Sequence, residues 1–187
     1  MKTTIINIVL FKLGWVACVL GAARDMAWVG LVAVAVIAAV HLALASSPRR
    51  EMVVLAAAAV VGVVWESLLV NQGLLDYGQT SSPYGVAPNW IVAMWVLFAT
   101  TLNVSMNWLK KHPLLAVVAG GVGGPMAFVA GEKMGAVQFS EGLLSLTVIG
   151  IGWALLLPLL VSVSRRFNGH ATPSRVGQRG VALDAGV

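Results

Sequence analysis

Apolar residues fill six long stretches of the chain, and polar residues gather in the short segments between them. A transmembrane α-helix needs about 20 mostly apolar residues to cross the hydrocarbon layer of a bilayer. Each stretch comes close to that length, so the pattern predicts an all-α fold: a polytopic membrane helix bundle with six transmembrane helices, in one domain over residues 1–164. The approximate spans are residues 4–22, 27–45, 52–70, 89–108, 113–131 and 143–164.

The amino-acid composition indicates that lipid, rather than water, surrounds the predicted helices. Of all residues, 59% are hydrophobic and 10% are charged, and the mean hydropathy is +0.89. Soluble domains carry about 25% charged residues, so a water-soluble domain is excluded and the lipid bilayer is the expected partner. The net charge of +5 is spread in small clusters rather than along one face, so nucleic acid is not expected to bind. A single cysteine, Cys18, excludes an internal disulfide framework.

The basic residues mark one side of the predicted bundle. The side that holds both termini carries Lys2, Arg49, Arg50, Lys110, Lys111, Arg165, Arg166, Arg175 and Arg179. The other side carries Arg24 and Lys133, each beside an acid, while Lys12 lies inside the first span. Because cytoplasmic loops hold the excess of Lys and Arg, we predict that both termini are cytoplasmic. Residues 165–187 lack apolar periodicity and are predicted to form a basic, disordered cytoplasmic tail.

The connection from Asn71 to Pro88 is long and rich in Gly, Ser and Pro, which predicts turns rather than a long helix. A loop of this kind is either a binding element or lid, or a plain exposed linker. With the neighbouring helix ends it forms a candidate polar mouth on the outer side. The residues of this candidate mouth are Asn71, Tyr77, Asn89, Glu132 and Lys133.

Four polar residues fall inside predicted spans and form a candidate intramembrane polar site: Lys12, His41, Glu66 and Asn103. A charged group at the centre of a spanning helix costs about 2.5 to 3.5 kcal/mol on insertion and is by default a functional-site hypothesis. Lys12 lies near the midplane and Glu66 in the outer third, so the two can pair, or each can extend to the nearer interface. Glu66 is the best candidate for a catalytic acid or base. His41 has no cysteine or second intramembrane histidine beside it, so neither a metal site nor a cofactor is expected.

Three further patterns concern packing. Asn103 and Asn107 are four residues apart and Thr100 is three residues before Asn103, which predicts one polar stripe on a helix that faces protein or a cavity. Gly120 and Gly124 have the GxxxG spacing beside Pro125, which predicts close helix contact or, alternatively, an opened helix that exposes backbone groups to a ligand. The deeper tryptophans either line an apolar pocket or only pack, and they are Trp15, Trp95 and Trp153.

Several strings of this sequence resemble one family. They are INIVLFKLGWVACVLGA, WESLLVNQGLLDYG, PNWIVAMWVLFATTLNVSMNWL, GGVGGPMAFVAGEKMGA and GWALLLPLL. Together they are similar to small bacterial integral membrane proteins catalogued as a domain of unknown function, over about residues 5 to 160. The resemblance implies a multi-pass protein of the bacterial inner membrane, often encoded beside lipid-modifying enzymes and flavin-dependent oxidoreductases. It transfers no catalytic residue.

Three functions follow from these observations. The protein is an enzyme or accessory factor that acts on a membrane lipid or isoprenoid, with Glu66 as acid or base. Alternatively it is a membrane subunit that captures or transports a small molecule, or a non-catalytic assembly partner of another membrane protein held by GxxxG contacts. The expected ligand is a lipid or another hydrophobic small molecule, and the sequence leaves open whether the protein is an enzyme.

Overall fold

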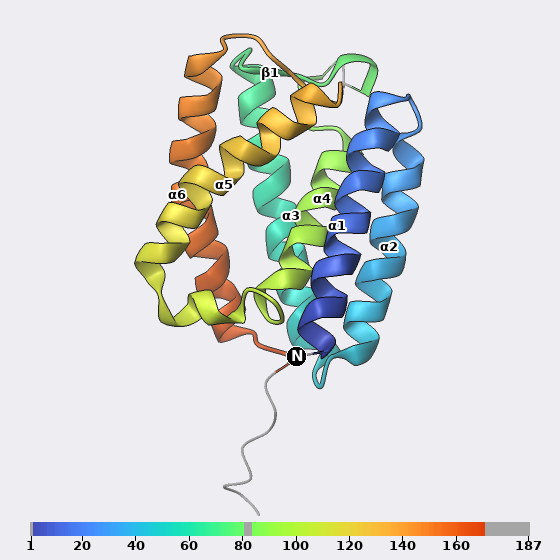
Figure 1. The fold of residues 1–187 in the computed structure, drawn as a ribbon, viewed down its shortest axis with the longest axis vertical. Coiled ribbons are helices and arrows are strands. Elements are labelled where there is room, and N and C mark those ends of the chain that lie inside the picture. The colour runs from blue at the N-terminus through green and yellow to red at the C-terminus, as the bar shows by residue number, and fades with distance from the viewer. Residues whose placement is uncertain (1, 81–83, 171–187) are drawn as a thin grey trace, which may run out of the picture.

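The computed structural model describes residues 2–80 and 84–170, and within these ranges six α-helices dominate (Figure 1). The elements are α1 (Lys2–Ala23), α2 (Ala27–Leu44), α3 (Pro48–Asn71), β1 (Leu75–Asp76), the 3-10 helix η1 (Gly78–Thr80), α4 (Asn89–Leu102), the 3-10 helix η2 (Asn107–Lys111), α5 (Pro113–Lys133), β2 (Gln138–Phe139) and α6 (Leu143–Arg166). The predicted all-α class is confirmed. Five helices, all but α4, are long and apolar enough to cross a membrane.

Helix α4 departs from its predicted span because it ends at Leu102 rather than at residue 108. The hydroxyls of Thr100 and Thr101 donate to backbone carbonyls three residues earlier, and the amide of Asn103 donates to a carboxylate of α3. Polar side chains that hydrogen-bond in this way offer the backbone an alternative to a continued helix. Of the predicted stripe, Thr100 and Asn103 are buried, but Asn103 lies in a turn and Asn107 is exposed in η2, so the prediction that all three share one helix face is wrong.

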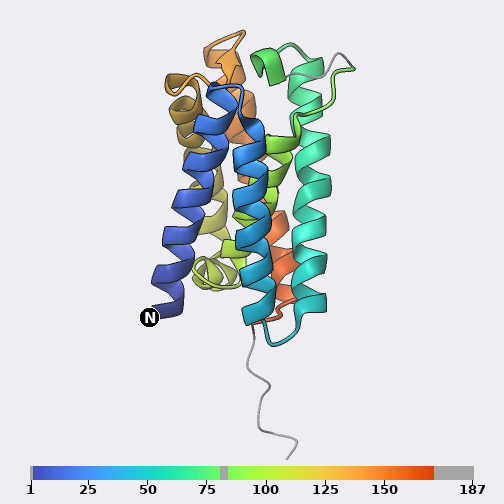
Figure 2. The ribbon, with the colours of Figure 1, turned by 90° about the vertical axis from the view of Figure 1, so that its right-hand side faces the viewer.

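Helix α4 lies in the middle of the bundle. Helix α1 packs along α2, α3 along α4, and α5 along α6, and α4 also contacts α1, α2 and α6 (Figures 1 and 2). The neighbouring helices cover α4, so its 14 residues, about 21 Å of helix, do not need to match the bilayer alone. Helix α5 runs through Pro125 as one helix and crosses α6 obliquely in Figure 1.

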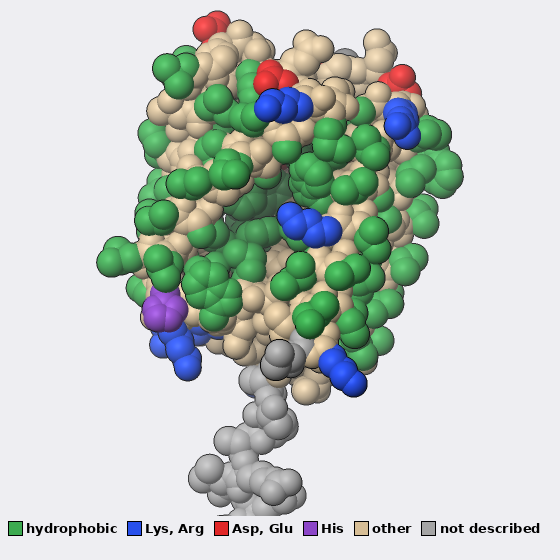
Figure 3. All heavy atoms as spheres, viewed as in Figure 1, with side chains coloured by type: hydrophobic (Ala, Val, Ile, Leu, Met, Phe, Trp, Pro, Cys, Tyr) green, Lys and Arg blue, Asp and Glu red, His purple; other side chains and the backbone are tan. Residues whose placement is uncertain are grey.

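The outer surface of the long helices is apolar. Large side chains on these helices face outward, among them Leu13, Val60, Val122 and Leu155, which are 61%, 63%, 56% and 69% exposed. Figure 3 shows hydrophobic side chains over most of the face that it presents. Exposed apolar surface of this extent marks contact with a membrane. Five helices of spanning length with such a surface make this a multi-pass membrane protein.

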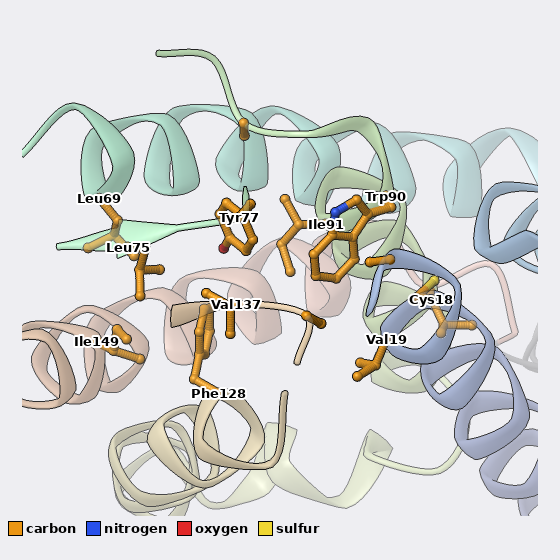
Figure 4. Close-up of a cluster of buried hydrophobic side chains, with 14 of the residues drawn as sticks. Cys18, Val19, Leu69, Leu75, Tyr77, Trp90, Ile91, Phe128, Val137 and Ile149 are labelled. Atoms are coloured by element: carbon orange, nitrogen blue, oxygen red, sulfur yellow. The ribbon is translucent and has the colours of Figure 1, made fainter. Parts of the chain in front are cut away.

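The two ends of the bundle differ in charge. We call one of them the basic end, where α1 begins and α6 ends, and its described Lys and Arg residues are Lys2, Arg49, Arg50, Lys110, Lys111, Arg165 and Arg166. At the opposite end, which we call the loop end, β1 pairs with β2 in an antiparallel ribbon, with Leu75 opposite Phe139. Figure 4 shows the core beneath this ribbon, where Tyr77, Val137 and Phe128 lie in one buried cluster.

The chain after α6 turns back onto the bundle. Helix α6 ends at Arg166, two residues beyond the predicted span. The backbone N–H of Ser47, just before α3, donates to the carbonyl of Gly169 at 2.9 Å. The predicted disordered tail began at residue 165, so its first residues belong to the helix and to a segment packed on the α2–α3 connection. Residues 171–187 of that tail lie outside the described residues.

Candidate functional site

A cavity of about 480 Å³ lies between α1, α4, α5 and α6 and is lined mainly by apolar and aromatic side chains. Sites for small molecules have volumes of about 300 to 1,000 Å³ and similar walls. Figure 3 shows the cavity as a hollow between α1 and α5. The nearby side chains of Leu13 on α1 and Met126 on α5 are 61% and 66% exposed, so the outer surface beside the opening is apolar.

Three tryptophans that the sequence placed deep in the membrane line this cavity: Trp15, Trp95 and Trp153. The rings of Trp95 and Trp153 stack with centroids 4.5 Å apart and an interplanar angle of 18°. Glycines make room for them. A Cβ atom at Gly62 would lie 2.5 Å from Cγ of Trp95, and one at Gly124 would lie 2.4 Å from Cγ of Trp153. Both distances are too short for any side chain, so these glycines allow the indoles to lie directly on the helix backbones.

Gly120 shows the same close approach between α5 and α6. A Cβ atom there would lie 2.1 Å from the backbone oxygen of Trp153. Gly120, Gly124 and the adjoining Pro125 thus lie at the α5–α6 contact, where Pro125 approaches Gly150 of α6. The GxxxG spacing brings two helices of this chain together.

Glu66 lines the cavity and is fully buried. The hydroxyl of Tyr77 donates to its Oε2 at 2.7 Å, and the indole N–H of Trp95 donates to its Oε1 at 2.8 Å. Each carboxylate oxygen therefore has a donor, which compensates for the loss of water around a buried polar group. Burial, and then the neighbouring Glu66, raise the pKa of Tyr77 well above its usual value, so Tyr77 is a neutral donor. Glu66 thus joins α3 to α4 and to the loop that covers the cavity.

Lys12 also lines the cavity, and its side chain is exposed. Its Nζ lies 6.0 Å from the ring centre of Phe11. Among the described residues no carboxylate forms an ion pair with Lys12, and the partners of Glu66 are Tyr77 and Trp95 instead. Lys12 and Glu66 thus share one cavity without pairing. Lys12 lies halfway along α1, about 15 Å from either end.

The other two residues of the candidate intramembrane site lie elsewhere, at the basic end. Nε2 of His41 lies 2.9 Å from Oε2 of Glu51, and the amide of Asn103 donates to Oε1 of Glu51 at 2.6 Å. The backbone N–H of Gly169 donates to the same Oε1 at 2.7 Å, and Glu51 is fully buried. The Lys110 ammonium donates to the amide oxygen of Asn103. Glu51 therefore joins segments from α2, α3, the end of α4 and the chain after α6.

Neither Glu51 nor His170 was predicted from the sequence as a site residue. The rings of His41 and His170 lie 4.7 Å apart, and with Glu51 these residues place three potential metal ligands within 4.8 Å of one another. Burial lowers the pKa of His170, which favours the neutral imidazole. Burial also lowers the pKa of Lys110, against the opposing effect of Glu51. A signal for Glu51 was present, since residues 41 and 51 are equally distant from the middle of the short α2–α3 turn and so face each other across it.

The residues of the candidate outer mouth do not converge. Tyr77 reaches the cavity and Glu66, whereas Asn71 donates to the carbonyls of Ser67 and Gly85 and holds the loop. Oε1 of Glu132 accepts a hydrogen bond of 3.3 Å from the backbone N–H of Phe139 in β2. The remaining two, Asn89 and Lys133, are exposed at helix ends.

Comparison with known proteins gives a family and no function. No curated protein and no solved structure matches the chain. A family model matches residues 4–159, which include all six helices except the first two residues of α1 and the end of α6. The described cavity, the Glu66 contacts and most of the Glu51 cluster lie within the matched residues, and the resemblance of the sequence to a domain of unknown function is confirmed. The chain belongs to the family described as "Protein of unknown function (DUF2878)".

Proposed function

We propose that this protein binds an amphiphile with one hydrocarbon chain and an anionic group, such as a fatty acid or an isoprenoid phosphate, which enters the cavity sideways from the bilayer. The observation that carries the proposal is Lys12: a basic side chain halfway along a spanning helix, at the opening of a lipid-facing cavity, without an acidic partner among the described residues.

At this depth the Lys12 ammonium must either pair with an anion or extend along its side chain to water at a membrane surface. A charged side chain at this depth costs about 2.5 to 3.5 kcal/mol on insertion. A carboxylate or phosphate that pairs with the ammonium neutralises both charges, and the chain of the same molecule then fills the apolar cavity. A ligand with a neutral head would leave the Lys12 charge uncompensated.

The rest of the cavity suits the hydrocarbon part of such a ligand. Stacked indoles and Phe98, which meets Trp153 edge to face at 5.3 Å, form a flat apolar wall. Both oxygens of Glu66 are already bound, so Glu66 acts here by positioning Tyr77 and Trp95. Binding of this kind is the step shared by an enzyme that acts on a lipid and by an accessory factor that presents one.

The test uses two brominated probes that differ only in charge, 9,10-dibromostearate and its methyl ester. Bromine quenches tryptophan fluorescence on contact, and four tryptophans line the cavity: Trp15, Trp90, Trp95 and Trp153. In detergent-purified protein we expect the acid to quench at a lower concentration than the ester. Lys12→Met keeps the length of the side chain without its charge and should remove this difference.

Two matched variants separate cavity binding from general lipid contact. A Cβ atom at Gly123 meets nothing within 4 Å and Gly123 lines the cavity, so Gly123→Leu should fill the opening and reduce quenching by both probes. The side chain of the neighbouring Val122 faces outward and is 56% exposed. Both probes should therefore quench the fluorescence of Val122→Leu as they quench that of the wild type. Lys111→Met, at the basic end, should also leave the difference between the probes unchanged. Equal quenching by both probes in the wild type, or unchanged quenching in Gly123→Leu, would refute the proposal.

We further propose that all six helices cross the bacterial inner membrane, with the basic end in the cytoplasm. The basic end holds most described Lys and Arg residues, as cytoplasmic loops do. Alkaline phosphatase is active only outside the cytoplasm. A fusion after Val187 should be inactive, and one after Gly142, in the α5–α6 connection, should be active; the reverse pattern would contradict this orientation.

A further inference from the structure

The cluster around Glu51 contains a buried nitrogen that lacks a partner. Among the described residues, Nε2 of His170 is buried without a hydrogen bond. Leaving such a group unsatisfied costs about 1 to 3 kcal/mol. The segment nevertheless holds His170 in this position, because the neighbouring Gly169 N–H donates to Glu51 and the Gly169 carbonyl accepts from Ser47.

Two other side chains with potential metal-ligand atoms, those of Glu51 and His41, lie close to His170. Oε2 of Glu51 and Nε2 of His41 are 2.9 Å apart, and all three potential ligand atoms lie within 4.8 Å of one another. We propose that His41, Glu51 and His170 bind a divalent transition-metal ion, with Zn²⁺ as the best fit. Two imidazoles and one carboxylate are an established Zn²⁺ ligand set, which leaves a fourth position for water.

The distances permit this site with small movements. Bonds of about 2.0 to 2.2 Å in tetrahedral geometry place ligand atoms about 3.4 Å apart. The pair from His41 and Glu51 must separate by about half an ångström, and His170 must move inward by at most about 1.4 Å. The ion takes the place of the proton that joins His41 to Glu51.

The surroundings of Glu51 already resemble the outer shell of a metal site, where ligating carboxylates are themselves hydrogen-bonded. Asn103 and Gly169 both donate to Oε1, which leaves Oε2 for His41. The Lys110 ammonium is bound by the amide oxygen of Asn103, so the amide lies between this cation and the carboxylate. The expectation from sequence that no metal binds rested on His41 having no second histidine beside it, and His170 supplies one.

A bound ion would link three segments of the chain at the basic end. His41 lies on α2, Glu51 on α3 and His170 in the segment after α6. Antiparallel helices and a terminal segment would thus be linked at one point. A metal ion that binds only the folded state stabilises it by RT ln(1 + c/Kd) at a free metal concentration c, so the temperature of unfolding rises with the metal concentration.

The test measures Zn²⁺ binding to tag-free protein after treatment with a chelator. Isothermal titration in detergent should give one Zn²⁺ per chain, and added Zn²⁺ should raise the unfolding temperature. Loss of an outer-shell partner weakens metal binding about 10- to 100-fold. His170→Ala and Glu51→Gln remove direct ligands and should therefore weaken binding more than about 100-fold, while Asn103→Ala should fall within that range.

The third histidine of the chain provides the control. His112 is exposed beside Trp108 and is not among the three clustered ligands, so His112→Ala should bind Zn²⁺ like the wild type. Lys110→Met removes a neighbouring positive charge and should bind Zn²⁺ more tightly. His170 lies outside all helices, so His170→Ala should retain its helical circular dichroism; His170→Gln serves as a second variant. Visible absorption of bound Co²⁺ should disappear in both. Zn²⁺ binding in His170→Ala equal to the wild type, or an equal loss in His112→Ala, would overturn the proposal.

Discussion

Replacing Glu66 by glutamine tests how this carboxylate is accommodated in the bundle. In the structure Oε1 accepts from Trp95 and Oε2 accepts from Tyr77. A glutamine has one oxygen and one NH2 group, so one of the two buried donors would face another donor. We therefore expect Glu66→Gln to destabilise the protein although the side chains are nearly equal in size.

The expected loss follows from two estimates. Hydrogen bonds inside membrane proteins contribute about 0.6 kcal/mol on average and about 1.7 kcal/mol at most. A buried donor left without an acceptor costs about 1 to 3 kcal/mol. Glu66→Gln should therefore lower the free energy of unfolding by about 1 to 3 kcal/mol, and Glu66→Leu, which leaves both donors unsatisfied, should lower it further.

Reversible unfolding in mixed micelles, followed by circular dichroism, measures these differences. In the double variant Glu66→Gln with Tyr77→Phe, the NH2 group faces an apolar ring instead of a hydroxyl donor. The loss should then be smaller than the sum of the two single losses by about 0.5 kcal/mol or more, as for residues in contact. If Glu66 instead extended to the membrane surface, Glu66→Gln would be neutral or stabilising and the two changes would be additive; either result would refute the described contacts.

Three further changes have expected outcomes. Gly124→Ala should lower the free energy of unfolding by about 1 to 3 kcal/mol, because its Cβ would meet Trp153, whereas Gly123→Ala, which meets nothing, should be neutral or slightly stabilising in the same micelle assay. Asp25 has a φ of 56°, which favours glycine, so Asp25→Gly should raise the unfolding temperature, and an unchanged or lower value would contradict the described turn. Tyr77 ionises in the unfolded chain at about pH 10 but at a higher pH when folded, so stability should fall as pH rises above 10, by about 1.4 kcal/mol at pH 11. Tyr77→Phe should lack this decrease, and parallel pH profiles would contradict the burial of Tyr77.

Much of the fold could be predicted from the sequence because lipid allows few solutions for an apolar stretch of about 20 residues. The end of α4 could not, since Thr100, Thr101 and Asn103 use their side chains for hydrogen bonds that a hydropathy pattern does not record. Helix boundaries in the other spans differ by no more than four residues from the predicted ones.

The site was predicted only in part, for a physical reason. The position of Lys12 and Glu66 along their helices predicts that both lie within the membrane. Position along a helix does not show toward which neighbouring helix a side chain points. The different contacts of Lys12 and Glu66 are therefore seen only in the folded chain. Glu51 reads as a surface charge beside two arginines, yet it is fully buried by partners from distant segments. His170 lay in a segment whose composition predicts disorder, and its position depends on the backbone of Gly169 rather than on any periodic pattern.

The proposed function requires that the cavity bind an anionic amphiphile from the bilayer. Photo-crosslinking with a fatty acid that carries a diazirine in its chain, followed by mass spectrometry of peptides, tests it most directly. The labelled residues should belong to the cavity lining, such as Phe11, Trp15 and Ala127, and labelling should decrease with added oleate and in Lys12→Met. Labelling confined to outward-facing residues such as Val36 and Leu155, with no decrease on addition of oleate, would contradict the account.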